Sequence, residues 1–161
     1  MIDLALIWVG IIGLGVLIYV VMDGFDLGIG ILFPFIKDHQ ERDVMMNTVA
    51  PVWDGNETWM VLGGASLYAA FPLAYATVLS ALYLPITFMV VALIFRGVAF
   101  EFRFKATRTK YLWDQAFIWG SILSSFFQGV ILGAYIQGIE TTHGIYSGAA
   151  WDWLTPFSIV S

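Results

Sequence analysis

Long stretches without charge are the feature that most constrains this chain. Residues 4–36 carry only two charged side chains, Asp23 and Asp26, and residues 58–95 and 115–139 carry none. A helix crosses the hydrocarbon core of a bilayer in about 20 residues. We therefore predict an all-α polytopic membrane protein, a bundle of four transmembrane helices with spans near residues 4–36, 47–71, 73–98 and 114–138.

The composition supports a membrane protein and excludes several other classes. Of the 161 residues, 60% are hydrophobic and only 12% are charged, whereas a soluble domain carries about 25% charged residues. The absence of cysteine excludes disulfides, thiolate-bound clusters and covalent c-type haem. A net charge of −5 without a basic stripe argues against a nucleic-acid partner.

Both ends of the chain carry information about its span count. The start, Met1-Ile2-Asp3, lacks the basic region of a signal peptide, so the first span is expected to be retained. Trp151 and Trp153 resemble an aromatic belt at a membrane interface. Residues 154–161 therefore predict the start of a possible fifth span, and with it a longer polypeptide.

The basic residues predict the orientation. All seven lie in the loops after the first and third predicted spans, which must share one side of the membrane: Lys37, Arg42, Arg96, Arg103, Lys105, Arg108 and Lys110. The opposite side carries Asp3, Glu140 and Asp152. The positive-inside rule then places the basic loops in the cytoplasm and the N-terminus outside.

Asp23 and Asp26 are candidate functional residues of the first span. They share one helix face and lie near mid-depth, where a carboxylate costs at least about 2.5–3.5 kcal/mol. They either relay protons or hydrogen-bond the backbone around the neighbouring glycines. We favour a proton-transfer role for at least one of them.

A second acidic pair, Asp54 and Glu57, follows Pro51. Asp54 can cap a helix that starts near Gly55. Alternatively, a helix that starts near Asn47 spans the bilayer and places Asp54 about 10 Å inside its cytoplasmic end. The second interpretation, which we favour, predicts a carboxyl group that takes up protons from the cytoplasm.

Two further polar sets have less specific patterns. Asp114, Ser121, Ser125 and Gln128 form one stripe of the fourth span, which either bonds back to its own helix, the preferred interpretation, or forms a hydrated seam. Arg96 and Glu101 flank the inner end of the third span. Arg96 either extends to the lipid headgroups or pairs with an acid such as Asp54 or Glu57.

The histidines argue against a haem in this chain. A membrane bundle that binds haem usually carries axial histidines inside its spans, and here His39 and His143 both lie in predicted loops. The Glu140–His143 spacing of a di-iron bundle occurs once, in an outer loop. We predict that the chain itself binds no haem and no metal.

Three sequence blocks nevertheless resemble a known family. Residues 23–30 (DGFDLGIG), 51–59 (PVWDGNETW) and 95–103 (FRGVAFEFR) are similar to subunit II of the cytochrome bd-type quinol oxidases, which use ubiquinol or menaquinol and include the cyanide-insensitive type. That subunit has about eight spans in two four-helix halves, so the resemblance makes this chain the N-terminal half.

The resemblance implies a haem-free subunit of a bacterial inner-membrane oxidase. Its partner, subunit I, would carry two b-type haems, one d-type haem and the quinol site, and small accessory subunits, lipid and quinone are possible further partners. Asp54, with its neighbour Trp53, matches the proton-pathway carboxylate of the family. Asp23 and Asp26 match the acids of its first span, and Arg96 and Glu101 match a block of structural residues.

An alternative function is half of a proton-coupled secondary transporter. Such transporters carry intramembrane acids and interrupted helices, and Pro51, Pro85 and the glycines after Asp23 allow such interruptions. Haem d absorbance in the complex purified through this chain would distinguish the oxidase from the transporter.

Overall fold

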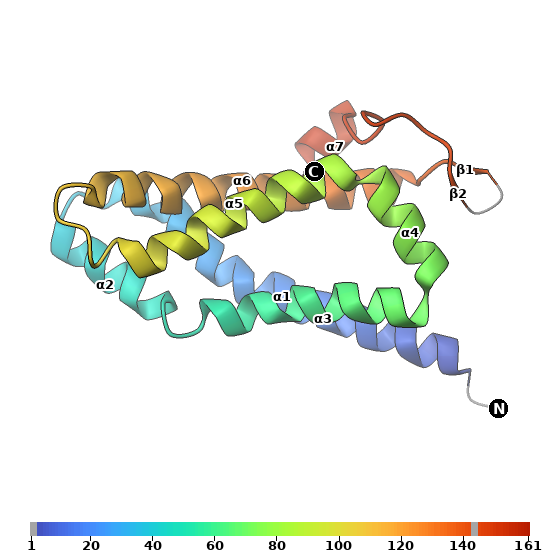
Figure 1. Cartoon of the computed structure of the whole chain (residues 1–161), viewed down its shortest axis with the longest axis horizontal. Helices are drawn as coiled ribbons and strands as arrows, with labels where there is room; N and C mark the ends of the chain where they lie inside the picture. The colour runs from blue at the N-terminus through green and yellow to red at the C-terminus, as the bar shows by residue number, and fades with distance from the viewer. Residues whose placement is uncertain (1–2, 143–144) are drawn as a thin grey trace.

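A computed structural model describes residues 3–142 and 145–161 and is almost entirely helical (Figure 1). The all-α prediction is confirmed. In chain order the elements are α1 (Leu4–Leu32), η1 (Phe33–Phe35), α2 (His39–Val49), α3 (Trp53–Ala70), α4 (Pro72–Ala81), α5 (Tyr83–Phe102), α6 (Lys110–Gln137), β1 (Thr141–Thr142), β2 (Ile145–Tyr146) and α7 (Pro156–Val160).

The long helices form two pairs. Helix α1 packs along α3, α5 packs along α6, and a contact between α1 and α6 joins the pairs. Figure 1 shows α4 crossing from one pair to the other at one end, while α2 closes the other end. The short hairpin of β1 and β2 follows α6 at the end where α4 lies.

Three helices of the described residues are long and apolar enough to cross a membrane: Leu4–Phe35, Tyr83–Phe102 and Lys110–Gln137. The helices do not match the four predicted spans one to one. The predicted span near residues 73–98 divides at Leu82 into α4 and α5.

The prediction that one helix starts near Asn47 and continues through Pro51 is wrong. Helix α2 ends at Val49 and α3 begins at Trp53, with a turn between them in which the Val52 amide donates to the Val49 carbonyl oxygen at 3.0 Å. Proline has no amide hydrogen, and its ring clashes with the carbonyl group four residues earlier. Asp54 therefore lies in the first turn of α3.

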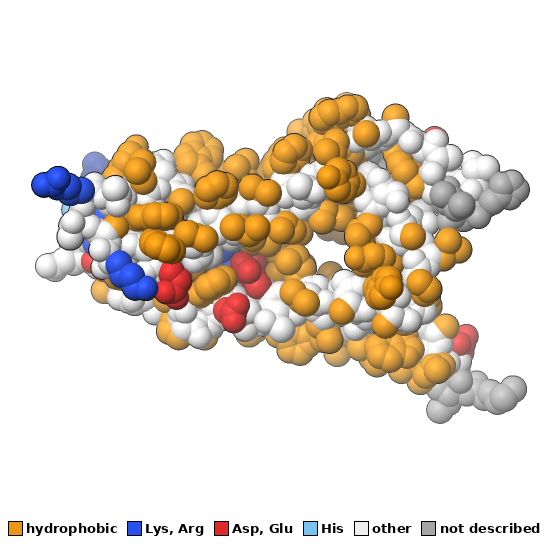
Figure 2. Space-filling model, in the orientation of Figure 1, with side chains coloured by type: hydrophobic (Ala, Val, Ile, Leu, Met, Phe, Trp, Pro, Cys, Tyr) orange, Lys and Arg blue, Asp and Glu red, His pale blue; other side chains and the backbone are white. Residues whose placement is uncertain are grey.

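Basic side chains of the loops gather at one end and apolar residues cover the flanks. Figure 2 shows Lys and Arg side chains at the end that holds α2 and the α5–α6 loop, which we call the basic end. Along α1, side chains such as Leu6, Leu17 and Val21 are exposed. Such a continuous apolar surface marks a membrane or protein interface, and the chain is a polytopic membrane protein.

Close contacts at two glycines set the positions of α1 and α5 against α6. A Cβ atom at Gly30 of α1 would lie 1.9 Å from the Ser121 hydroxyl oxygen. A Cβ atom at Gly120 of α6 would lie 2.8 Å from the Ala92 carbonyl oxygen and 3.0 Å from the Arg96 Cβ atom. Small residues permit such backbone approach between membrane helices, and here they bring Arg96 beside α6.

Candidate functional site

Helices α1, α3 and α5 bring ionisable side chains together inside the bundle. We call Asp23, Asp26, Asn56, Glu57 and Arg96 the acid cluster. Asp23, Asp26 and Arg96 are completely buried, and the Glu57 side chain is 19% exposed. Three of these residues carry a carboxyl group and one carries a guanidinium group.

Arg96 is the centre of the acid cluster. Its Nη2 atom donates at 2.8 Å to Asp23 Oδ1 and at 2.8 Å to Glu57 Oε1. One guanidinium nitrogen thus joins α5 to α1 and to α3. Arg96 pairs with two acids and does not extend to the headgroups, and Glu57 is the partner that α3 supplies.

Asp26 has a different partner. Asn56 Nδ2 donates to Asp26 Oδ2 at 2.8 Å and lies 3.5 Å from the Met22 carbonyl oxygen. The two aspartates of α1 therefore share a buried face but face different groups, a cation at Asp23 and an amide at Asp26. The Asn56 amide is neutral, so this hydrogen bond adds no positive charge beside the Asp26 carboxyl group.

Several buried polar atoms of the acid cluster have no hydrogen-bond partner among the described residues. They are Asp23 Oδ2, Asp26 Oδ1, and Nε and Nη1 of Arg96. Buried polar atoms in native proteins nearly always bind a protein group or an ordered water. The unpaired oxygen atoms of the two aspartates can therefore bind a proton or accept a hydrogen bond from water, and the unpaired nitrogen atoms of Arg96 can donate to water.

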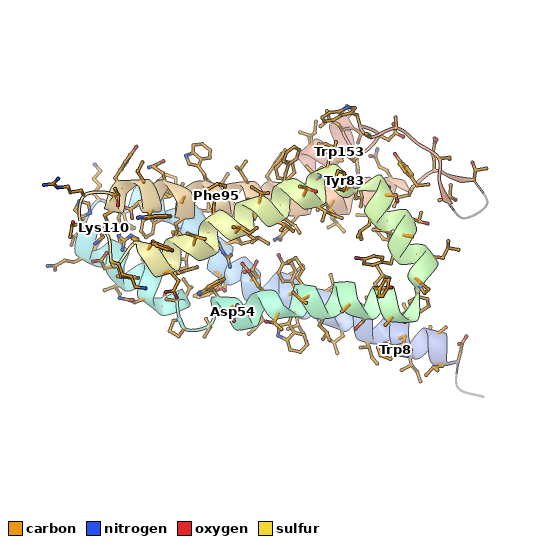
Figure 3. All side chains as sticks on the ribbon, in the orientation of Figure 1. Trp8, Asp54, Tyr83, Phe95, Lys110 and Trp153 are labelled. Atoms are coloured by element: carbon orange, nitrogen blue, oxygen red, sulfur yellow. The ribbon has the colours of Figure 1, made fainter. Side chains whose placement is uncertain are left out.

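Asp54 lies at the edge of this cluster. Figure 3 shows it at the start of α3, where its side chain is exposed and close enough to Glu57 for an electrostatic interaction. The first turn of a helix favours negative charge. Asp54 and Glu57 therefore connect the protein surface to the buried acids.

Trp53 holds the start of α3 against α5. Its ring stacks on Phe100, with centroids 5.1 Å apart and planes inclined by 13°. A Cβ atom at Gly97 would lie 3.1 Å from the Trp53 Cη2 atom, so the glycine makes room for the indole. Trp53 thereby positions the first turn of α3, which carries Asp54.

The remaining predicted residues lie outside the acid cluster. Glu101 is largely exposed and 3.4 Å from Lys105. Of the polar stripe on α6, Asp114 and Ser121 are buried, Ser125 is only partly buried, and Gln128 contacts Tyr19 of α1. A serine that the sequence interpretation did not include, Ser124, is completely buried.

A second set of charges at the basic end was not predicted. We call Arg42, Asp43, Arg103, Lys110 and Asp114 the basic-end network. Arg103 is completely buried and donates to Asp114 and, at 2.6 Å, to Asp43. Arg42 lies 3.3 Å from Asp114, and Lys110 lies 3.0 Å from Asp43.

Aromatic rings support this network. The guanidinium groups of Arg42 and Arg103 lie 5.2 Å and 5.3 Å from the centroid of the Phe33 ring. Phe33 in turn packs edge-on against Phe117 of α6. The sequence singled out only Asp114 of this network, as part of the polar stripe on α6, and did not indicate its partners, because charged residues are common at helix ends and in loops.

Asp43 shows the electrostatic effect of the basic-end network. Partial burial raises its pKa, but hydrogen bonds from Lys110 and Arg103 outweigh that effect, and the pKa lies below the ordinary value of 3.8. The carboxylate of Asp43 is therefore held in its charged form by two cations.

Within residues 3–142 and 145–161, no group of three or more His, Cys, Asp or Glu side chains is arranged to hold a metal. His39 is exposed at the first turn of α2, while His143 lies outside the described residues. The acid cluster can bind and transfer protons, which is chemistry that needs only carboxyl and hydroxyl groups.

Comparisons with known proteins agree with the resemblance of the three sequence blocks. The family model described as "Cytochrome bd terminal oxidase subunit II" matches residues 4–161. Over 98% of its length, the chain is 34% identical to cytochrome bd-I ubiquinol oxidase subunit 2 of Escherichia coli (strain K12), and it covers 44% of that protein.

A second relative gives the same result. Cytochrome bd ubiquinol oxidase subunit 2 of Bacillus subtilis (strain 168) is 36% identical over 98% of this chain, which covers 47% of that relative. A probable cytochrome oxidase subunit 2 of Haemophilus influenzae is 35% identical over 87% of this chain and is covered to 39%. The chain spans less than half the length of these relatives.

Proposed function

Because the chain belongs to the subunit II family of the cytochrome bd terminal oxidases, we propose that it is a haem-free part of a quinol:oxygen oxidoreductase. Its relatives are subunits of bacterial cytochrome bd ubiquinol oxidases, and the apolar helices fit a multi-pass protein of the inner membrane. Its partner is the haem-bearing subunit I, against which it acts as a scaffold. Small accessory subunits, lipid and quinone are further candidate partners.

The haems belong to the partner in this proposal. Two b-type haems and one d-type haem there would transfer the electrons of quinol to oxygen. The described residues of this chain provide no intramembrane histidine as an axial ligand, so we assign the chain no step in electron transfer. We therefore assign its ionisable residues a role in proton transfer.

The acid cluster is the observation that carries the proton-uptake role. It holds more carboxyl groups than cations at a buried position, with unpaired oxygen atoms on Asp23 and Asp26. Excess negative charge in a low-dielectric interior is strongly unfavourable, which favours the binding of protons. Asp54 and Glu57 connect this cluster to the surface near the basic end.

The direction of uptake follows from the charge distribution. Lys and Arg side chains gather at the end that holds α2 (Figure 2), and the exposed Asp54 lies at the start of α3, on the side of the bundle toward that end (Figure 3). By the positive-inside rule this end faces the cytoplasm. Protons would pass from Asp54 to Glu57 and then to Asp23, toward the middle of the membrane. Quinol oxidation outside, combined with proton uptake from the cytoplasm, separates charge across the membrane.

Replacement of Asp54 tests this function. In the complex purified through this chain, Asp54→Asn should slow oxygen reduction about 10²-fold, the lower range for loss of a positioned proton-transfer group, with haem content unchanged. Glu101→Gln is the matched control, because Glu101 is an exposed acid that lies outside the acid cluster and pairs with Lys105. Unchanged turnover in Asp54→Asn would disprove the proton-uptake role, and absence of haem from the complex would favour the transporter alternative.

A further inference from the structure

Tyr19 continues the polar groups of the acid cluster beyond Asp23. It lies on α1 one helical turn farther from the basic end, about 6 Å along the axis, and its side chain is 6% exposed. Its phenol interacts with the carboxyl group of Asp23. In the rest of α1 toward the N-terminus, residues 4–18, every side chain is uncharged and apolar.

Gln128 of α6 holds this phenol in place. Its Nε2 atom donates to the Tyr19 hydroxyl oxygen at 2.6 Å. The phenol oxygen thus accepts from Gln128, and its own proton remains free to be donated. The phenol also interacts with the Asp23 carboxyl group one turn along the same helix face, so Tyr19 links Asp23 of α1 to Gln128 of α6.

The seam between α1 and α6 carries a further free hydroxyl group beside these residues. Gly30 meets Ser121, and Tyr19 meets Gln128. Ser124 falls between these two contacts, at the level of α1 that carries Asp23 and Asp26. It is completely buried, and its hydroxyl oxygen has no partner among the described residues, and ordered water commonly satisfies buried polar groups of this kind.

We propose that Tyr19 carries the proton path from Asp23 to the α1–α6 seam and that Gln128 is its positioning residue. In this step the Asp23 carboxyl group gives a proton to the Tyr19 oxygen, while the phenol releases its own proton to a water held by Ser124 and Gln128. One O–H bond forms on Tyr19 as another breaks, so Tyr19 carries no lasting charge. This inference rests on the proposed proton-uptake function.

Two variants test the proposal in the assembled oxidase complex. Tyr19→Phe keeps the ring and removes the hydroxyl group, and should slow oxygen reduction about 10²-fold with haem content unchanged. Gln128→Leu removes the donor that orients the phenol and should slow it less. Tyr111→Phe, at a tyrosine that is 67% exposed, is the matched control and should turn over like the parent complex.

Two readouts separate a relay from a structural role. Slowed turnover in Tyr19→Phe should come with a larger solvent isotope effect in D₂O, because proton transfer becomes rate-limiting. Infrared spectra should show a shift of a carboxyl band in both variants, because the phenol that interacts with Asp23 is removed in one variant and reoriented in the other. A structural role would lower turnover and leave the isotope effect and the band unchanged, which would overturn the proposal.

The outcome also distinguishes this proposal from the proton-uptake function. If Asp54→Asn is slow and Tyr19→Phe turns over normally, the path does not include Tyr19 and only the present inference fails. If both turn over normally, both fail. Should Tyr19→Phe prevent assembly of the complex, Gln128→Leu decides, and normal turnover with an unshifted band in that variant refutes the relay.

Discussion

The acid cluster and the basic-end network are built from the same residue types in opposite proportions. The basic-end network has three cations for two carboxylates, and Arg103 Nη2 is its one buried side-chain atom without a partner in the described part of the chain. The acid cluster has one cation for three carboxyl groups and several unpaired atoms. Among the described residues, the basic-end network thus leaves one buried side-chain atom unpaired, and the acid cluster leaves four.

We propose that this difference separates structural charges from functional ones. A buried polar network whose members are all satisfied fixes the geometry of its helices. A network with excess negative charge and free acceptors instead binds protons or water. Both contain a completely buried arginine, so burial of a charge alone does not reveal which role it has.

The largest expected effect comes from removing the one cation of the acid cluster. Arg96→Leu leaves Asp23 and Glu57 without their guanidinium partner, and breaking a buried ion pair in this way costs about 3–5 kcal/mol. We expect a large loss of assembled complex in membranes and a lower thermal unfolding midpoint of what remains. Arg108→Leu, at an exposed arginine of the basic end, should assemble normally.

A double variant sharpens this result. Arg96→Leu combined with Asp23→Leu removes a cation and its acid together, and should recover part of the lost stability. If Arg96→Leu alone assembles normally, the acids of the cluster do not need a positive charge. The contrast with the basic-end network would then be wrong.

The corresponding change in the basic-end network should cost less. In Arg103→Leu, Asp114 keeps Arg42 and Asp43 keeps Lys110, so each carboxylate retains one cation. We expect a loss of about 1–3 kcal/mol in the free energy of unfolding, the range for one lost buried hydrogen-bond partner. Oxygen reduction per assembled complex should be unchanged, and a decrease in it would give this network a functional role.

The sequence was most informative where the bilayer imposes a strict rule. Uncharged stretches predicted the helices of α1 and α6, because a charge at depth is costly. For the same reason Asp23, Asp26 and Arg96 stood out as candidates. A polar residue in an apolar span is conspicuous without any knowledge of its partners.

Features that depend on tertiary contacts escaped prediction. Arg103 meets Asp43 across 60 positions of sequence, and Arg42 meets Asp114 across 72. Charged residues are common in loops and at helix ends, so no local sequence pattern identifies which of them form pairs. The turn at Pro51 was the reverse case: the local signal was present, but the expectation of a span of full length outweighed it.

The smallest expected effect is a pH dependence confined to the basic-end network. The folded-state pKa of Asp43 lies below its ordinary value of 3.8, so its ion pairs stabilise the fold above that pH and are lost as the pH falls through the folded-state value. Because Asp43 is 36% exposed, solvent screening limits its contribution to about 1 kcal/mol or less. Asp43→Asn should therefore flatten the acid side of the thermal unfolding profile and leave turnover at neutral pH unchanged. Asp54→Asn should instead slow turnover at neutral pH and leave the thermal unfolding profile unchanged. The same effects in both variants would contradict the distinction between the acid cluster and the basic-end network.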